Sequence, residues 1–191
     1  MKINNHYIRN IFLQRNLYII FLIMGSFFDA QTVNVSGNWS PVIPAITEAG
    51  NNYAGTYDNT TTTPTTITLS GTLPGSFLNL LSSSGAKMTM RYTPNPWNNS
   101  LTLSARRTGG STTIHGVCVL CTSAINGGTT YIPISQTADV TFLTFTFSGL
   151  LGLGNSVSFA DVNLILQLAG VSVTVPASTY SARVVFTIVA N

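Results

Sequence analysis

The sequence predicts an all-β protein that folds as a single antiparallel sandwich. After residue 30, apolar and polar residues alternate with a period of two in several separate runs, as in strands with one buried face. No stretch beyond that point keeps a helical period for three turns. Turn residues separate the runs, and short strands joined by turns without intervening helices are typical of a sandwich. A chain of this size buries enough surface for one core, so we expect one domain.

The strands follow one another at short intervals, and the alternation is clearest in the segments AKMTMRYTP and DVNLILQL. Proline, glycine and asparagine mark the turns between the runs. The predicted strands cover residues 66–73, 86–94, 100–107, 129–136, 139–149, 161–168 and 180–189.

Three segments between these strands lead to other predictions. The threonine-rich tract at residues 58–66 has low complexity and is predicted to be an exposed loop. Residues 76–85 have a helical spacing for about one turn before a glycine ends it. Arg106 and Arg107 precede two glycines, which predicts the solvated end of a hairpin.

The N-terminus fits a secretory signal peptide. An apolar run at residues 17–28 is short for a membrane span of roughly 20 residues. We expect cleavage after Ala30, which leaves Gln31 as the first mature residue, with Gly25 or Ser26 as the alternative position. The mature chain is therefore expected to be secreted or at the cell surface, with no membrane span. The basic residues that precede the run are Lys2, Arg9 and Arg15.

Removal of the signal also removes most of the positive charge. The full chain has a formal net charge of +3, whereas residues 31–191 hold five basic and four acidic residues, a net charge of +1. A nearly neutral chain has no electrostatic footprint for nucleic acid, so we expect no nucleic-acid partner. Surfaces with few charges tend to associate, because little repulsion keeps the copies apart.

Two cysteines, Cys118 and Cys121, lie close together in the segment HGVCVLCTS. In an exported protein this arrangement favours a disulfide that closes a tight loop. With His115 the cysteines would offer three metal ligands, but no fourth is evident, so no metal site is predicted. A redox-active pair would need a setting such as a helix N-terminus to lower the thiol pKa, and the sequence predicts none nearby.

The chain lacks catalytic groups at a useful spacing. Residues 31–191 hold one histidine, one glutamate and three aspartates, and no two carboxylates are close in sequence. His115 has no serine or cysteine partner in a recognisable nucleophile motif, so we interpret it as a surface or strand histidine. We therefore expect neither an enzyme nor a cofactor.

Trp97 is the one loop aromatic with the features of a binding platform. It lies in the segment TPNPWNNS, where Asn98 and Asn99 could supply hydrogen bonds to a glycan stacked on the indole. The alternative is an indole that folds back to anchor its own loop. We favour this alternative, because the two prolines of the segment already restrict the backbone.

The last strand raises the question of what covers it. Its two faces alternate, and a tyrosine two residues before a core position is typical of strand F in immunoglobulin-like sandwiches. If this is strand F, no sequence remains for strand G, so the sandwich lacks its last strand and leaves a groove beside unpaired backbone. The residues on the predicted groove face are Tyr180, Ala182, Val184, Phe186 and Ile188.

An exported, threonine-rich all-β chain that ends in such a strand resembles the pilins of chaperone–usher fimbriae, and most of all the archaic branch related to spore-coat-U-like proteins. The resemblance implies a signal peptide at residues 1–30, an N-terminal extension at residues 31–40 and a sandwich at residues 41–191. It also implies that the extension inserts beside the last strand of a neighbouring copy, with Val33 and Val35 in its pockets and Gly37 at a narrow position. The implied partners are other copies or related subunits, a periplasmic chaperone and an usher.

A second interpretation keeps the sandwich complete within one chain. Residues 32–37, TVNVSG, would then supply the missing strand of their own sandwich. Such a protein would be a secreted adhesin or carbohydrate-binding module rather than a fibre subunit.

Overall fold

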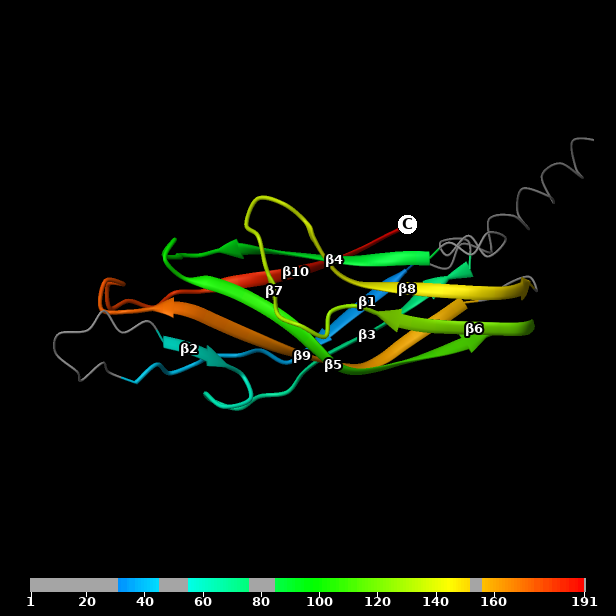
Figure 1. The fold of residues 1–191 in the computed structure, drawn as a ribbon, viewed down its shortest axis with the longest axis horizontal. Coiled ribbons are helices and arrows are strands. Elements are labelled where there is room, and N and C mark those ends of the chain that lie inside the picture. The colour runs from blue at the N-terminus through cyan, green and yellow to red at the C-terminus, as the bar shows by residue number, and fades with distance from the viewer. Residues whose placement is uncertain (1–30, 45–54, 76–84, 152–155, 191) are drawn as a thin grey trace, which may run out of the picture. The chain divides into compact units, whose positions relative to one another are not determined.

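The computed structural model describes residues 31–44, 55–75, 85–151 and 156–190. It confirms an all-β fold of two packed antiparallel sheets (Figure 1). The predicted signal peptide and the predicted helical turn at residues 76–84 lie outside the described residues. The strands are β1 (Thr32–Ser36), β2 (Gly55–Asp58), β3 (Ile67–Pro74), β4 (Gly85–Pro94), β5 (Thr102–His115), β6 (Cys118–Asn126), β7 (Ile132–Pro133), β8 (Val140–Leu151), β9 (Ser156–Val171) and β10 (Ala182–Ala190).

One sheet, which we call sheet A, has the strand order β1-β3-β9-β5-β7, and β2 also pairs with β9. The other, sheet B, has the order β10-β4-β8-β6. The order β1-β3-β9-β5 matches strands A, B, E and D of an immunoglobulin-like sandwich, and β10-β4 matches strands F and C. The chain departs from that plan between β5 and β9, where β6 and β8 extend sheet B beyond β4. Among the described residues no strand occupies the position of strand G beside β10.

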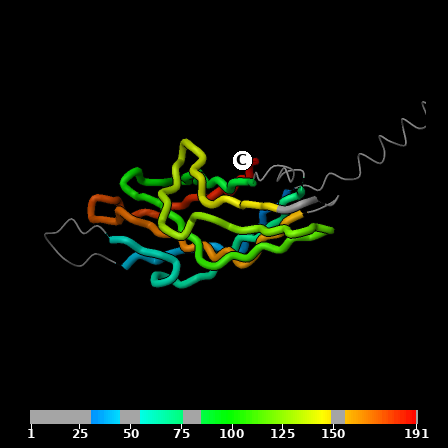
Figure 2. Tube along the Cα trace, turned by 45° about the vertical axis from the view of Figure 1, so that its right-hand side comes forward, coloured from blue at the N-terminus to red at the C-terminus, as the bar shows by residue number. Residues whose placement is uncertain are grey.

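The core lies between the two sheets, and Figure 2 follows the chain as it passes between them. Alternation with a period of two places one face of each strand inside, as along β4, where Met88 and Met90 are fully buried. Phe145 of β8 and Phe159 of β9 meet across the interface with ring centroids 4.8 Å apart. The largest fully buried side chains are Phe142, Phe145, Phe159, Leu69, Leu73, Met88, Met90, Leu143 and Val162.

The pairing of β5 with β9 corrects the predicted hairpin end at the two arginines. β5 continues past them to His115 and stays paired with β9 along its length. The glycines that suggested a turn, Gly109 and Gly110, have positive φ inside the strand, and Asp161 opposite them has φ 57°. The two glycines therefore do mark irregular backbone, but it is a local distortion within a long strand pair and not a turn.

Candidate functional site

The predicted groove strand, β10, presents the expected face to the core. Ala182, Val184 and Phe186 are half-buried and pack against the core, whereas Ile188 is buried. Tyr180 is half-buried and lies just before the strand begins. The face is therefore least covered over the first half of the strand and closed only near its end.

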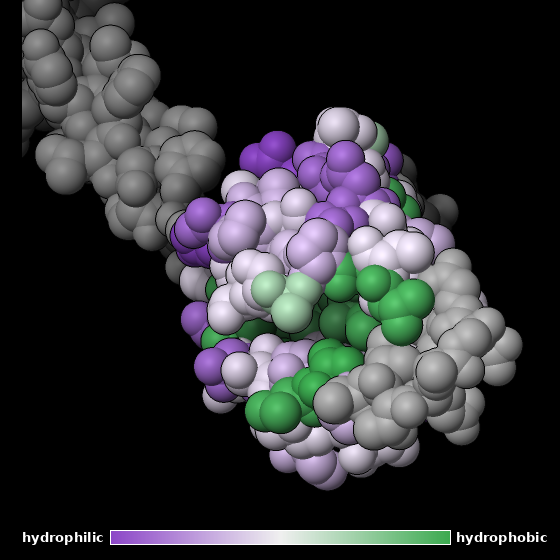
Figure 3. Space-filling view, turned by 90° about the vertical axis from the view of Figure 1, so that its left-hand side faces the viewer, coloured by the Kyte–Doolittle hydropathy of each residue, from purple (hydrophilic) through white to green (hydrophobic). Residues whose placement is uncertain are grey.

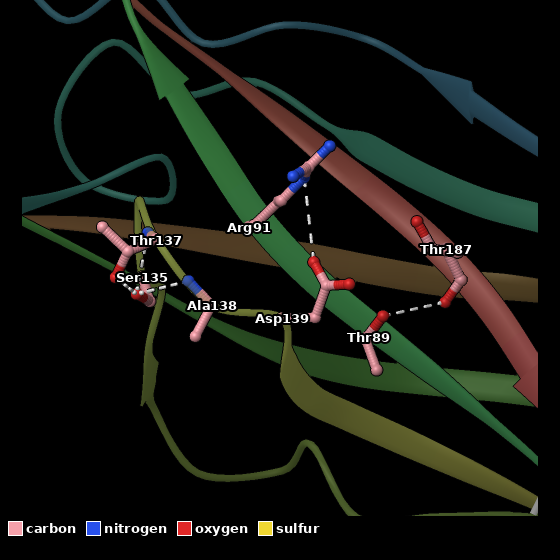
Figure 4. Close-up of polar contacts among 7 residues, drawn as sticks. All are labelled: Thr89, Arg91, Ser135, Thr137, Ala138, Asp139 and Thr187. Atoms are coloured by element: carbon pink, nitrogen blue, oxygen red, sulfur yellow. Dashed lines mark hydrogen bonds and ion pairs between the residues drawn. The ribbon is translucent and has the colours of Figure 1, made fainter.

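The backbone N–H and carbonyl groups of successive β10 residues point alternately toward β4 and away from it. Ser181 exchanges hydrogen bonds with the loop after β4, and Thr89 of β4 donates to the carbonyl of Thr187 at 3.3 Å (Figure 4). Odd-numbered residues thus direct their backbone groups toward β4, and successive residues of a strand point to opposite sides. Even-numbered residues accordingly point theirs away from β4, as the Ile188 carbonyl does when it accepts from Gln31 Nε2 at 3.4 Å.

On the same side of the sandwich, β1 occupies the edge of sheet A. It pairs antiparallel with β3, with Val33 opposite Gly71, and lies next to β10. A Cβ at position 71 would collide with the carbonyl oxygen of Thr32, so glycine is what allows β1 to approach. Val33 packs against the core, but Val35 is 50% exposed. The two predicted donor valines are therefore paired with β3 in their own chain's sheet A and are not paired with their own β10.

The segment after β1 is fixed by two residues. Gly37 has φ +100°, and a side chain there would collide with the carbonyl oxygen of Thr66. Trp39 donates its indole N–H to the carbonyl of Thr62 at 2.8 Å and packs against the core. The predicted narrow position at Gly37 thus serves a close approach within the same chain and marks the point where β1 joins the rest of the sandwich.

The opposite side of the sandwich is closed by polar contacts. Arg107 Nε donates to the carbonyl of Gly127 at 2.7 Å, and Arg107 Nη2 donates to that of Ile125 at 3.0 Å. Nearby, the Thr112 hydroxyl donates to the Ser123 carbonyl at 3.1 Å. Hydrogen bonds from a charged donor are stronger than neutral ones, so this side is held firmly. The sequence did not indicate this role of Arg107.

Tyr180 forms the corner expected of a strand-F tyrosine. Its hydroxyl donates to the carbonyl of Pro176, four residues earlier, at 2.8 Å. A hydrogen bond from this tyrosine back to the preceding backbone is a hallmark of immunoglobulin-like sandwiches. It fixes the loop from which β10 starts.

Replacing Tyr180 by phenylalanine should lower the free energy of unfolding by about 1 kcal/mol, because one intramolecular hydrogen bond is lost while the ring stays in place. Urea denaturation of the purified chain measures this. Tyr57→Phe is the matched control, since the structure gives that hydroxyl no hydrogen bond within the described residues, and it should change stability by less than about 0.5 kcal/mol. Equal losses in the two variants would contradict the corner.

The disulfide between Cys118 and Cys121 is confirmed, with Cα atoms 5.8 Å apart. It spans a bulge in β6, where the pairing with β8 shifts register between Val119 and Thr122. Both cysteines are half-buried and pack against the core. Bonded to each other, they cannot serve as metal ligands. Among the described residues no cluster of three histidine, cysteine or acidic residues could hold a metal ion.

Trp97 lies against its own loop and the end of β4. Its ring centroid is 5.3 Å from that of Tyr92, and its N–H donates to the carbonyl of Leu101 at 3.2 Å. With its N–H bonded and its ring packed against that of Tyr92, the indole has the features of an anchor. The anchor is the role that we favoured from the sequence, and glycan contact at Trp97 is the untested alternative.

We expect Trp97→Ala to destabilise the chain by about 2–3 kcal/mol, because a half-buried indole leaves a gap that the loop fills only in part. Thermal unfolding measures the loss. A glycan array with the wild-type chain and the variant should detect no glycan that depends on Trp97. Binding that disappears in a variant that is still folded would assign this loop a recognition role instead.

His115 has a serine partner that its sequence neighbours did not reveal. Its Nε2 lies 2.8 Å from the hydroxyl of Ser158, on the neighbouring strand β9. Both groups are on the exposed surface, and the only ion pair within the described residues joins Arg91 and Asp139 elsewhere, as Figure 4 shows. A serine–histidine pair without an orienting carboxylate is not a catalytic triad.

The threonine-rich loop contains a buried residue that the sequence missed. Asn59 is only 2% exposed, and its side-chain amide donates to the carbonyls of Thr65 and Leu164 while its oxygen accepts from the N–H of Leu166. Asp58 lies beside it, and the Thr60 hydroxyl is the main cause of a lowered pKa of that carboxyl. The first part of an apparent low-complexity tract therefore fastens the loop to β9.

Helices long and apolar enough to cross a bilayer are not found in the part of the chain that the structure describes. The chain matches no protein-family model, no curated protein and no solved structure. The function is therefore argued from the geometry of the β1–β10 side.

Proposed function

We propose that this chain is a structural subunit of an extracellular fibre, assembled when a strand from a neighbouring copy is added beside β10. The observation that carries the proposal is that no strand among the described residues pairs with the outer edge of β10. Along it, Ala182, Val184 and Phe186 combine half-buried side chains with backbone groups that point away from β4. Addition of an extended segment to such an edge is a recurrent mode of recognition.

An added strand would gain stability from two sources at once. Each new backbone hydrogen bond contributes about 0.5–1.5 kcal/mol net. Each valine that the strand buries contributes about 1.5–3 kcal/mol. On the opposite side β6 is the edge strand of sheet B, but its Ile125 carbonyl already accepts from Arg107 and its Ser123 carbonyl from Thr112. Strand addition would therefore select one side of the molecule.

The donor we propose is the segment of residues 31–40 of the neighbouring copy. In its own chain, β1 buries little apolar surface, since Val33 is half-buried and Val35 half exposed. Its release would sacrifice mainly a short ladder with β3, which the added position would replace. Its release would also break the hydrogen bond from the Trp39 indole to the Thr62 carbonyl. Before assembly, an exported chaperone would cover the same edge, as the resemblance to pilins implies, and an usher would mediate the exchange at the cell surface.

The double substitution Val33→Asp with Val35→Asp should abolish polymers and leave a folded monomer. In the monomer both positions are at least partly exposed, whereas in an added strand both side chains would face the core, where an unpaired carboxylate is costly. Light scattering after size exclusion measures the polymer fraction. The matched control, Thr32→Asp with Asn34→Asp, adds the same charge to exposed positions of β1 and should still polymerise.

A synthetic peptide of residues 31–40 tests the acceptor separately from the donor. Added to the double variant, it should bind and raise the melting temperature, because the groove beside β10 is unchanged. Val184→Pro should prevent peptide binding, since it removes an outward backbone N–H, whereas Val184→Ala loses similar packing and keeps that N–H. A wild-type chain that stays monomeric at every concentration and gains no stability from the peptide would contradict the proposal.

The pairing of β1 with β3 in the same chain favours a second candidate, a self-contained secreted sandwich that binds a glycan or a protein. In that case Val33→Asp with Val35→Asp would destabilise the monomer instead of affecting assembly. The same two measurements, polymer fraction and melting temperature, separate the two functions.

A further inference from the structure

The side chain of Gln31 occupies one backbone group on the outer edge of β10. Its Nε2 donates to the carbonyl of Ile188 at 3.4 Å. Even-numbered residues of β10 point their backbone groups away from β4, so this carbonyl belongs to the edge that an added strand would pair with. Among the described side chains, that of Gln31 is the one that bonds an outward backbone group of this strand.

The two ends of β10 are covered to different extents. At the start of the strand Ala182 and Val184 are half-buried, and Figure 3 shows hydrophobic surface in a recess between the two sheets at that end. At the other end Ile188 is buried, and the Gln31 amide bonds its carbonyl. An added strand can therefore start its ladder at the open end, but it completes the ladder only when Gln31 releases the Ile188 carbonyl.

Gln31 is also the residue that cleavage after Ala30 would place at the N-terminus, and the compact unit that holds the sandwich begins there. The free α-amine of an N-terminal glutamine attacks the carbonyl carbon Cδ of its own side chain. A bond forms between the α-nitrogen and Cδ, the Cδ–Nε2 bond breaks, and Nε2 leaves as ammonia with one proton from the amine. The product is a lactam ring, pyroglutamate, and no co-reactant is needed. In the uncleaved chain the α-nitrogen belongs to a peptide bond and is not nucleophilic, so the reaction requires removal of the signal.

We infer that Gln31 of the mature chain cyclises to pyroglutamate, and that this modification frees the outer edge of β10 for strand addition. The inference rests on the proposed function and on cleavage after Ala30, and it adds a regulatory step to the same site. Cyclisation removes the atom Nε2 that bonds the Ile188 carbonyl. Gln31 is exposed and its hydrogen bond is long, so the fold does not hold the side chain back from the reaction. Export thereby converts a capped edge into an open one.

Mass spectrometry of the exported chain tests the modification. The chain is expressed with residues 1–30 in a secreting host and purified from the medium or the periplasm. The protein should start at position 31, with a mass lower by one ammonia than that of unmodified residues 31–191, and should resist stepwise N-terminal sequencing. The Gln31→Ala variant should start at the same position and remain open to sequencing. A free Gln31 amine after export, or a start at another residue, would overturn the inference.

Binding of the peptide of residues 31–40 tests the effect on the edge. The peptide is acetylated at its N-terminus so that it cannot cyclise. The wild-type chain with a free Gln31, released from an N-terminal tag by a protease, is compared before and after treatment with a glutaminyl cyclase. The treated form should bind the peptide about two- to tenfold more tightly, the change that one net hydrogen bond gives.

Gln31→Ala is the matched control, because it has neither the amide nor the ability to cyclise. It should bind the peptide like the treated wild type, with or without the enzyme. Equal affinities of the untreated wild type and Gln31→Ala would reject the role of Gln31 and leave strand addition in place. Absence of peptide binding to every form would reject strand addition itself, and the regulatory step with it.

Discussion

Replacing Phe159 by alanine should lower the free energy of unfolding by about 3–5 kcal/mol, the loss typical of a large buried aromatic side chain. Phe159 is 2% exposed, and its ring packs against Phe145 from the opposite sheet at 4.8 Å between centroids. Its removal leaves a cavity at the centre of the interface between the sheets, where neither sheet can move inward without breaking its ladders. Urea denaturation followed by tryptophan fluorescence measures the loss.

Phe186→Ala is the informative control, because it removes the same side chain from the open edge. The ring of Phe186 is half-buried and lies 5.9 Å from that of Phe142. We expect a loss of about 2 kcal/mol, since water already reaches part of this ring and little cavity forms. A loss as large as that of Phe159→Ala would mean that β10 is covered in solution, which contradicts an open edge.

Asn59→Ala should destabilise the sandwich by about 2–4 kcal/mol, although the sequence places this residue in a threonine-rich loop. Three hydrogen bonds join its buried side chain to Thr65, Leu164 and Leu166. Alanine would leave the N–H and carbonyl groups of β9 without these partners, at about 1–3 kcal/mol for each buried group that stays unsatisfied. Chemical denaturation of the variant gives the value.

Asn163→Ala is the matched control for Asn59→Ala. Asn163 lies on the same strand as the partners of Asn59 but has an exposed side chain. We expect a change of less than about 0.5 kcal/mol. Similar losses at the two positions would show that the effect belongs to strand propensity and not to the buried hydrogen bonds.

The strands and their inward faces could be predicted from the sequence because alternation with a period of two is a local property. The face of β10 from Ala182 to Ile188 was predicted residue by residue and packs inward as expected. The local disulfide could be predicted for the same reason, since its partners are three residues apart.

The neighbours of each strand could not be predicted in the same way. β1 carries the alternation of an edge strand, but nothing in TVNVS distinguishes β3 from β10 as its partner. Strand partners are set by contacts between residues far apart in the chain, which a local pattern does not record. Gly71 is a clue to the pairing of β1 with β3, because the missing side chain allows β1 to approach. A glycine within a strand can equally mark a bulge or a bend, so the clue is not specific.

Polar residues that act at long range were also missed. Arg107 suggested a hairpin end because two glycines follow it, and Asn59 suggested a loop because threonines surround it. The backbone is irregular at both places, with positive φ at Gly109 and Gly110 and a turn at Asn59, but neither residue has the exposed setting that was predicted. The partners that give these residues their roles, on β6 and β9, come from elsewhere in the sequence.

The two sides of the sandwich are closed to different extents, and this determines how the two sheets can move relative to each other. Along the β5–β6 side, hydrogen bonds from Arg107 and Thr112 hold the two sheets together. Along the other side, one long hydrogen bond between described residues reaches β10, from Gln31, just before β1, to the Ile188 carbonyl. We therefore expect thermal fluctuations to separate the two sheets first along the β1–β10 side, while the β5–β6 side stays closed. The same asymmetry sets the side from which water first reaches the core.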